Sequence, residues 1–151
     1  LKTEEQIKEL TSDYKYVWKE NKNVNSQRKD ITEKEFKITY EYGKKVYLKE
    51  IDYEKAKTEL IENYEMSEGS ADIYLYAIVR LINGEKHIGR LITESALKYY
   101  VKRIFEDSDK EIQKNCLNSL KIYIDSANKD NYYKKVEDIY LRHLGQSNFV
   151  S

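Results

Sequence analysis

The hydrophobic residues recur at steps of three and four along most of the chain, which is the spacing of one face of an α-helix. The pattern is clearest over 52–83, DYEKAKTELIENYEMSEGSADIYLYAIVRLIN. Asp52 can cap a first helix, Ser67 or Ser70 can cap a second, and Gly84 follows the second as a C-terminal glycine does. A helix-turn-helix-like unit is therefore predicted over about 52–83. Its apolar stripes are Ala56, Leu60, Ile61 and Tyr64, and then Ala71, Tyr74, Ala77, Ile78 and Leu81.

Three further helices are predicted after this unit. Thr93 can cap a helix that ends at 107–108, and Ser108 with Glu111 forms a capping box that opens the next one. A last helix runs from about Tyr132 to Gly145. Their apolar stripes are Ala96, Tyr100, Val101 and Ile104; Ile112, Cys116, Leu117, Leu120 and Ile124; and Tyr133, Val136, Ile139, Tyr140 and Leu144.

Two segments precede the unit. A first amphipathic helix is predicted from the Thr3 and Gln6 capping box to about residue 20, followed by a polar loop at 21–29.

Residues 31–51 permit two structures. Alternating Phe36, Ile38, Tyr40 and Tyr42 fit a strand of a hairpin that turns at Gly43, whereas a cap at Asp30 or Thr32 and a stripe of Phe36, Tyr40, Gly43, Tyr47 and Ile51 fit a helix. We favour the helix, because an isolated two-stranded hairpin is marginal without a sheet to join.

Composition supports an all-α fold of six or seven helices. The chain of 151 residues has no proline, only five glycines and 36% charged residues, as long solvated helices do. No Pro- or Gly-rich linker divides it, so one domain is the default. The expected organisation is an N-terminal helix and polar loop at 1–30, a helical domain at 31–145 and a tail at 146–151.

Candidate chemistry is sparse. The single cysteine, Cys116, lies inside an apolar stripe, and the two histidines, His87 and His143, are far apart in sequence. This pattern predicts no catalytic residues, no metal site and no cofactor, so we expect a protein that is not an enzyme. With no signal-peptide pattern and no long apolar run, a cytoplasmic protein with no membrane partner is expected.

Three segments carry a resemblance to a known family. FKITYEYGKKVY (36–47), NYEMSEGSADIYLYAIVRLINGE (63–85) and GRLITESALKYYVKRIFED (89–107) together resemble the helical N-terminal domain of bacterial HNH-type restriction endonucleases. The family typically has a glycine in the turn before the second helix, where this chain has Glu65. The nuclease itself does not carry over, because two histidines cannot supply a His-Asn-His site.

The resemblance implies a DNA-binding or target-recognition module of a restriction-type nuclease system, with DNA and a nuclease as partners. The second helix would present its start to bases through Ser67, Glu68, Ser70 and Asp72, with Arg90 beside it. Because the 27 basic and 27 acidic residues cancel, phosphates would be bound by local patches. The acidic residues over 52–90 outnumber the basic ones by eight to five, the wrong sign for phosphate binding at the turn itself. We expect the cations to straddle that acidic helix start: Lys44, Lys45, Lys49, Arg80, Arg90, Lys98, Lys102 and Arg103.

Protein–protein interaction is the alternative function. The chain has fifteen tyrosines, and tyrosine is favoured at interface centres because it is large, rigid and amphipathic. A helical interaction or oligomerisation domain with no nucleic-acid role would use this surface, either toward a nuclease partner or toward a second copy.

Overall fold

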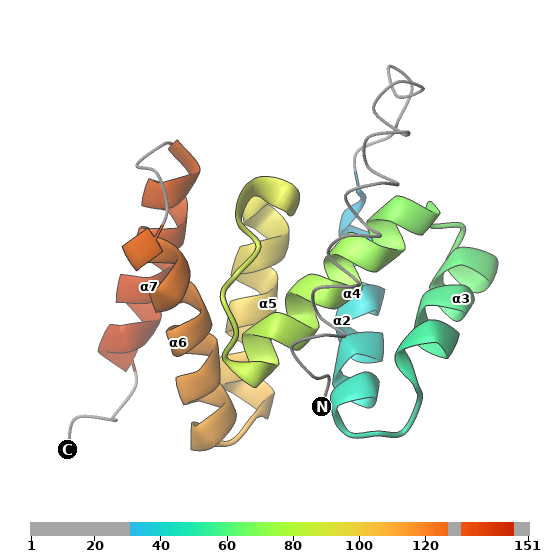
Figure 1. Ribbon diagram of the computed structural model, residues 1–151, viewed down its shortest axis with the longest axis horizontal. Coiled ribbons are helices and arrows are strands. Elements are labelled where there is room, and N and C mark those ends of the chain that lie inside the picture. Colours follow the sequence, from blue (N-terminus) through green and yellow to red (C-terminus); the bar gives the residue numbers. More distant parts are fainter. Residues whose placement is uncertain (1–30, 127–130, 147–151) are drawn as a thin grey trace. The chain divides into compact units, whose positions relative to one another are not determined.

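The computed structural model describes residues 31–126 and 131–146 of the chain (Figure 1). Within these ranges it has six α-helices, one short 3-10 helix and no strand, so the all-α fold of six or seven helices is confirmed. The helix predicted at 3–20, the polar loop after it and the residues from 147 onward lie outside the described residues.

The chain divides into two compact units, residues 1–75 and 76–151. The division falls inside helix α4 (Glu68–Asn83), a place that no linker composition marks in the sequence.

Unit 1 begins with the segment that permitted either a helix or a hairpin. It is helix α2 (Glu33–Tyr47), and of the two possible caps Thr32 forms it. The Thr32 hydroxyl accepts from the backbone N–H of Glu35 at 3.1 Å, and the Glu35 carboxylate accepts from the N–H of Thr32 at 2.8 Å. This reciprocal capping box satisfies two backbone donors that a hairpin would leave to water. The helix ends at Tyr47, so Ile51 lies beyond it.

Helix α3 (Tyr53–Tyr64) starts at the predicted Asp52 cap, whose carboxylate accepts from the N–H of Lys55 at 2.8 Å. It packs beside α2 (Figure 1), and the Tyr42 hydroxyl of α2 donates to the Glu59 carboxylate of α3 at 2.9 Å. At its end Glu65 adopts the left-handed conformation, with φ 58° and ψ 27°. The turn into α4 therefore has the backbone that favours glycine, although the residue is glutamate.

Helix α4 is capped at both ends. Of the two predicted serines, Ser67 is the cap, because its hydroxyl accepts from the N–H of Ser70 at 3.1 Å. Gly84 ends the helix with φ 77°, and the N–H of Glu85 donates to the carbonyl of Arg80 at 3.0 Å, as in a Schellman motif. Residues 71–79 between these ends are all buried.

Unit 2 contains the 3-10 helix η2 (Gly89–Leu91) and helices α5 (Glu94–Asp107), α6 (Lys110–Ser126) and α7 (Asn131–Gln146). The last three pack on one another as a bundle (Figure 1). The predicted Thr93 cap is present, since its hydroxyl accepts from the N–H of Ala96 at 3.2 Å. The bundle core is made of Ala96, Leu97, Tyr100, Val101, Ile104, Cys116, Leu117, Leu120, Tyr132, Val136 and Ile139.

Two sequence predictions in unit 2 are corrected. The cap of α6 is Asp109, whose carboxylate accepts from the N–H of Ile112 at 2.9 Å, while Ser108 closes α5 by donating its N–H to Ile104. The predicted box of Ser108 and Glu111 is therefore wrong, and a single cap bond from Asp109 takes its place one residue later. In α7 the core tyrosine is Tyr132, whose hydroxyl donates to the carbonyl of Ile92 at 3.0 Å, and not Tyr133.

Replacing Glu65 by glycine is expected to stabilise unit 1, because a non-glycine residue in the left-handed region costs about 1–2 kcal/mol and glycine costs roughly 0.5–1 kcal/mol in added unfolded-state entropy. The net gain should be about 0.5–1 kcal/mol, measured as a higher urea midpoint. Glu65→Asn should be neutral or stabilising and Glu65→Val destabilising. A glycine variant that is less stable than the parent would contradict the strained turn.

Candidate functional site

The predicted base-reading residues lie at the start of α4, in unit 1. Ser67 and Glu68 are exposed, and Ser70 is half-buried. Asp72 is only 9% exposed, and its carboxylate lies 3.4 Å from Lys57 Nζ and 3.4 Å from the Tyr53 hydroxyl, which donates to it. Burial raises the pKa of Asp72, and the Lys57 cation opposes this shift. Asp72 is thus part of an internal polar cluster, a position unsuited to the predicted base contact.

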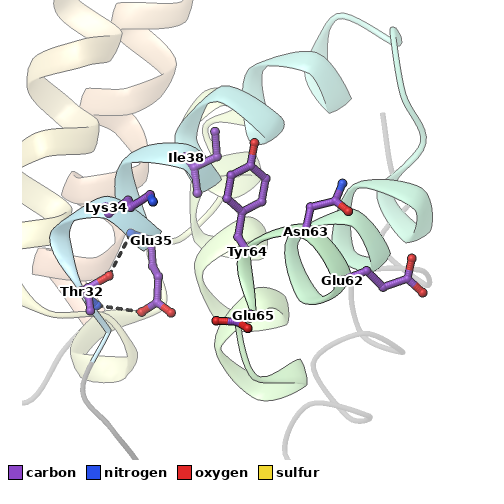
Figure 2. Close-up of a pocket in the computed structure, with 8 residues that line it drawn as sticks. All are labelled: Thr32, Lys34, Glu35, Ile38, Glu62, Asn63, Tyr64 and Glu65. Atoms are coloured by element: carbon purple, nitrogen blue, oxygen red, sulfur yellow. Dashed lines mark hydrogen bonds between the residues drawn. The ribbon is translucent and has the colours of Figure 1, made fainter.

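The cluster of Lys44, Lys45 and Lys49 lies at the opposite end of the α2–α3 pair from this helix start. Thr32 at the beginning of α2 and Glu65 at the end of α3 line one groove, so the two helices run antiparallel (Figure 2). Lys44 and Lys45 are in the last turn of α2, a helix of 15 residues and therefore about 22 Å long. The prediction that they flank the acidic helix start is wrong, since the antiparallel packing carries them away from it.

The groove in Figure 2 is acidic. It has a volume of about 380 Å³ and its charged lining residues are Glu35, Glu62 and Glu65 against Lys34. Over 31–75 the chain has eleven acidic and seven basic residues, so this unit disfavours phosphate around the start of α4. The remaining lining residues are Thr32, Ile38, Asn63 and Tyr64.

The middle of α4 is also closed to a ligand. A recognition helix lies in the major groove and needs a free face over its first turns, but residues 71–79 are all buried. Toward the predicted reading end, the accessible residues are those of the first turn, Ser67, Glu68 and Ser70. The prediction of two helices joined by a turn is confirmed. The part of α4 that could contact bases is its first turn alone.

The basic residues predicted in unit 2 divide into two groups. The arginines on α4 and α5 are both hydrogen-bonded. Arg80 donates to the Tyr76 hydroxyl of α4 at 2.8 Å and to the carbonyl of Lys86 in the following loop. Arg103 donates to two residues of its own helix, the Tyr99 hydroxyl at 2.6 Å and Asp107 at 3.2 Å. The others, Arg90, Lys98 and Lys102, have exposed side chains.

Lys98 and Lys102 line a groove of about 600 Å³ where α5, the start of α6 and the end of α7 meet. We call it the α5–α7 groove. Its charged residues are these two lysines and Arg142 of α7 against the single carboxylate of Glu106. The rest of its lining is Phe105, Gln113 and His143.

The sequence predictions missed Arg142, because its place in the groove depends on the packing of α7 against α5, some 40 residues apart. The local signal for Arg142 is its spacing: it lies three residues after Ile139 of the apolar stripe and directly before His143, at the edge of the buried face of α7. Over 76–126 and 131–146 the chain has twelve basic and nine acidic residues, so the groove belongs to the more basic unit.

A second polar site in unit 2 is buried. His87 is 1% exposed, and neither ring nitrogen has a hydrogen-bond partner in the described part of the chain. Its ring stacks on Tyr132 with centroids 6.3 Å apart and meets Tyr123 edge-on at 5.5 Å. Burial lowers the pKa of His87 to about 3, and the positive charge of Arg80 adds to this shift. His87 is therefore a neutral core residue.

Cys116 is buried too, and burial raises the pKa of its thiol. Among the described residues, no three His, Cys, Asp or Glu side chains are grouped so that they could hold a metal ion. The described helices also include none with the length and apolar character needed to cross a bilayer.

Comparisons with models of known protein families, with curated proteins and with solved structures found no match to this chain.

Replacing Asp72 by alanine is expected to lower the free energy of unfolding by about 1 kcal/mol, because the Lys57 ammonium loses a buried partner. The Tyr53 hydroxyl keeps the backbone carbonyl of residue 72 as an acceptor at 3.2 Å, and Lys57 keeps Glu68 at 3.7 Å. Asp72→Asn keeps an acceptor and should cost less. Chemical denaturation measures both. A variant of unchanged stability with altered preference among DNA sequences would instead support the base-reading role.

Acid should destabilise unit 2 through His87. The unfolded histidine titrates near pH 6.5, whereas the folded one stays neutral to about pH 3, so the unfolded chain alone gains a proton as the pH falls through this window. Stability from this group is complete above pH 6.5 and should decrease by about 2 kcal/mol between pH 7 and pH 5. His87→Phe should remove that part of the slope in urea denaturation. A parent and variant with parallel pH profiles would refute it.

Proposed function

We propose that this chain is a non-catalytic DNA-binding module of a restriction-type nuclease system, and that the α5–α7 groove is its phosphate-contacting surface. The observation that carries the proposal is the grouping of Lys98, Lys102 and Arg142 around one groove with a single opposing carboxylate. Phosphate contacts by lysine and arginine supply most of the sequence-independent affinity for DNA.

The cations of the groove can exchange their present partners for phosphates. Lys98 lies 3.3 Å from Glu94, and Lys102 lies 4.0 Å from Glu106, each one turn away on the surface of α5. Such exposed pairs contribute only about 0–1 kcal/mol, so a phosphate oxygen competes with them readily. Arg142 forms no ion pair with any residue in the described part of the chain.

The resemblance to the N-terminal domain of HNH-type restriction endonucleases supports the choice of nucleic acid over other anions. Its third segment, 89–107, is η2 and α5, and so includes Lys98, Lys102 and Phe105. The exposed first turn of α4 is a secondary contact in this proposal, because Glu68 can accept from a cytosine amino group but adds no affinity for phosphate.

Protein–protein interaction remains the second candidate, and exposed apolar residues favour it. Leu141 on α7 and Leu48 after α2 are each 55% exposed. Sedimentation of the chain at rising concentration tests self-association. A concentration-dependent increase in mass that Leu141→Ser abolishes would support this alternative.

Lys98→Ala with Lys102→Ala is expected to weaken binding to all duplexes and to flatten the salt dependence. Three phosphate contacts predict a slope of roughly −3 in log affinity against log salt, and each lost contact removes about one unit. Fluorescence anisotropy with a labelled duplex at low salt measures this. Lys121→Ala is the control for each single variant, Lys98→Ala or Lys102→Ala, because Lys121 is an exposed lysine of α6 that pairs with Asp125 and is not part of the groove.

The same titration separates the two basic surfaces. Lys44→Ala with Lys45→Ala removes the same charge from unit 1 and should leave the affinity nearly unchanged. If that variant loses binding while the α5 variant keeps it, the groove is the wrong surface. If the parent chain binds no duplex below about 100 μM, near the weak end of non-specific binding, the proposal of DNA binding itself fails.

A further inference from the structure

We infer that the α5–α7 groove accommodates one unpaired nucleotide base, stacked on Phe105, beside the cations that hold the nucleic-acid backbone. This inference rests on the proposed function, because it assigns a ligand to the same groove. The ligand class is a base that is not paired or stacked in a duplex, such as a bulged or extruded one.

Phe105 provides a ring at the groove that is held in place. It is half-buried in the last turn of α5, and its centroid lies 4.9 Å from that of His143 at an interplanar angle of 49°. His143 is itself only 8% exposed, and its Nδ1 is 3.0 Å from the carbonyl of Ile139. A ring supported in this way loses little side-chain entropy when a base stacks on it, and stacking contributes about 1–3 kcal/mol per base.

The cations lie on the same face of α5 as this ring. Lys98, Lys102 and Phe105 are separated by four and three residues, which places them one above another along the helix. A backbone that follows α5 across the two lysines would therefore bring a base to Phe105. Arg142 enters from α7, so positive charge is present on a second helix of the groove.

Gln113, at the start of α6, connects α6 to the end of α5 by hydrogen bonds. Its amide nitrogen donates to the carbonyls of Phe105 at 3.2 Å and Ser108 at 3.0 Å. These two bonds hold the end of α5, and with it the Phe105 ring, against the start of α6.

The size of the groove selects a base and not a duplex. A volume of about 600 Å³ falls within the ordinary range of small-molecule sites, roughly 300–1,000 Å³, and suits one base with its sugar. Stacked bases inside a duplex have no free face to offer a ring that lines such a groove. An unpaired base has a free face, and it binds without the further cost of being unstacked from a duplex.

The test compares two labelled duplexes in anisotropy titrations of the whole chain. One carries a single bulged adenine and the other an abasic residue at the same bulge, so that backbone charge and bending are matched. The bulged adenine should bind roughly 5- to 150-fold more tightly, the range that a stacking contribution of 1–3 kcal/mol predicts. Phe105→Leu should abolish this preference and leave the affinity for the abasic duplex unchanged, whereas Phe105→Tyr should keep the preference.

The outcomes separate the inference from the proposed function. Equal binding of both bulges by the parent, or an intact preference in Phe105→Leu, overturns the base site and leaves the phosphate surface standing. Weaker binding of both duplexes by the Lys98 and Lys102 variant, with the preference for the bulged adenine retained, supports both. If Phe105→Leu shows a reduced melting temperature, its affinity for the abasic duplex decides: an affinity equal to that of the parent shows that the variant is folded and that only base stacking is lost, whereas an equal loss for both duplexes overturns the base site.

Discussion

Residues 71–79 of α4 are buried one after another, so the middle of this helix has no face turned to solvent. A helix that is apolar all round must be covered by its neighbours, and both compact units draw core residues from it. Its one buried charge, Asp72, then needs partners inside the fold, which Lys57 and Tyr53 supply. This burial also decides where a ligand can bind, because it closes the helix that the sequence pattern presented as the reading element.

The caps and the helix types could be predicted from the sequence because they depend on a few neighbouring residues. Thr32, Asp52 and Thr93 each have a hydroxyl or carboxylate within reach of the N–H three residues later, as expected. The choice of helix over hairpin at 33–47 rests on a different argument, because the sequence predicts no sheet that a hairpin could join. Ser108 and Asp109 are adjacent and either could cap α6, so the local sequence does not distinguish them. The end of α5 does, because Ser108 closes that helix and leaves Asp109 to cap α6.

The site could be predicted only in part, because its members come together through tertiary packing. Lys98 and Lys102 were expected from α5 alone, whereas Arg142 and His143 reach the groove through the contact of α7 with α5. The prediction that Asp72 contacts bases is contradicted by a feature of the sequence itself, which is stronger than the helix-turn-helix pattern. The run IYLYAIV at 73–79 is apolar on every side, and such a helix is buried rather than presented to a ligand.

The α5–α7 groove has only three cations, which limits the affinity for nucleic acid that this surface can supply by itself. Three phosphate contacts give weak, salt-sensitive binding, and such binding carries no sequence information. A stacked base adds selectivity for an unpaired nucleotide but again reads no duplex sequence. In the proposed restriction system the useful affinity would therefore arise from linkage to a nuclease, since tethering supplies an effective concentration of about 1 mM and converts weak contacts into avidity. The acidic excess of 31–75 is consistent with this proposal, because it would disfavour contact between the α4 turn and a DNA backbone and leave that contact to the α5–α7 groove.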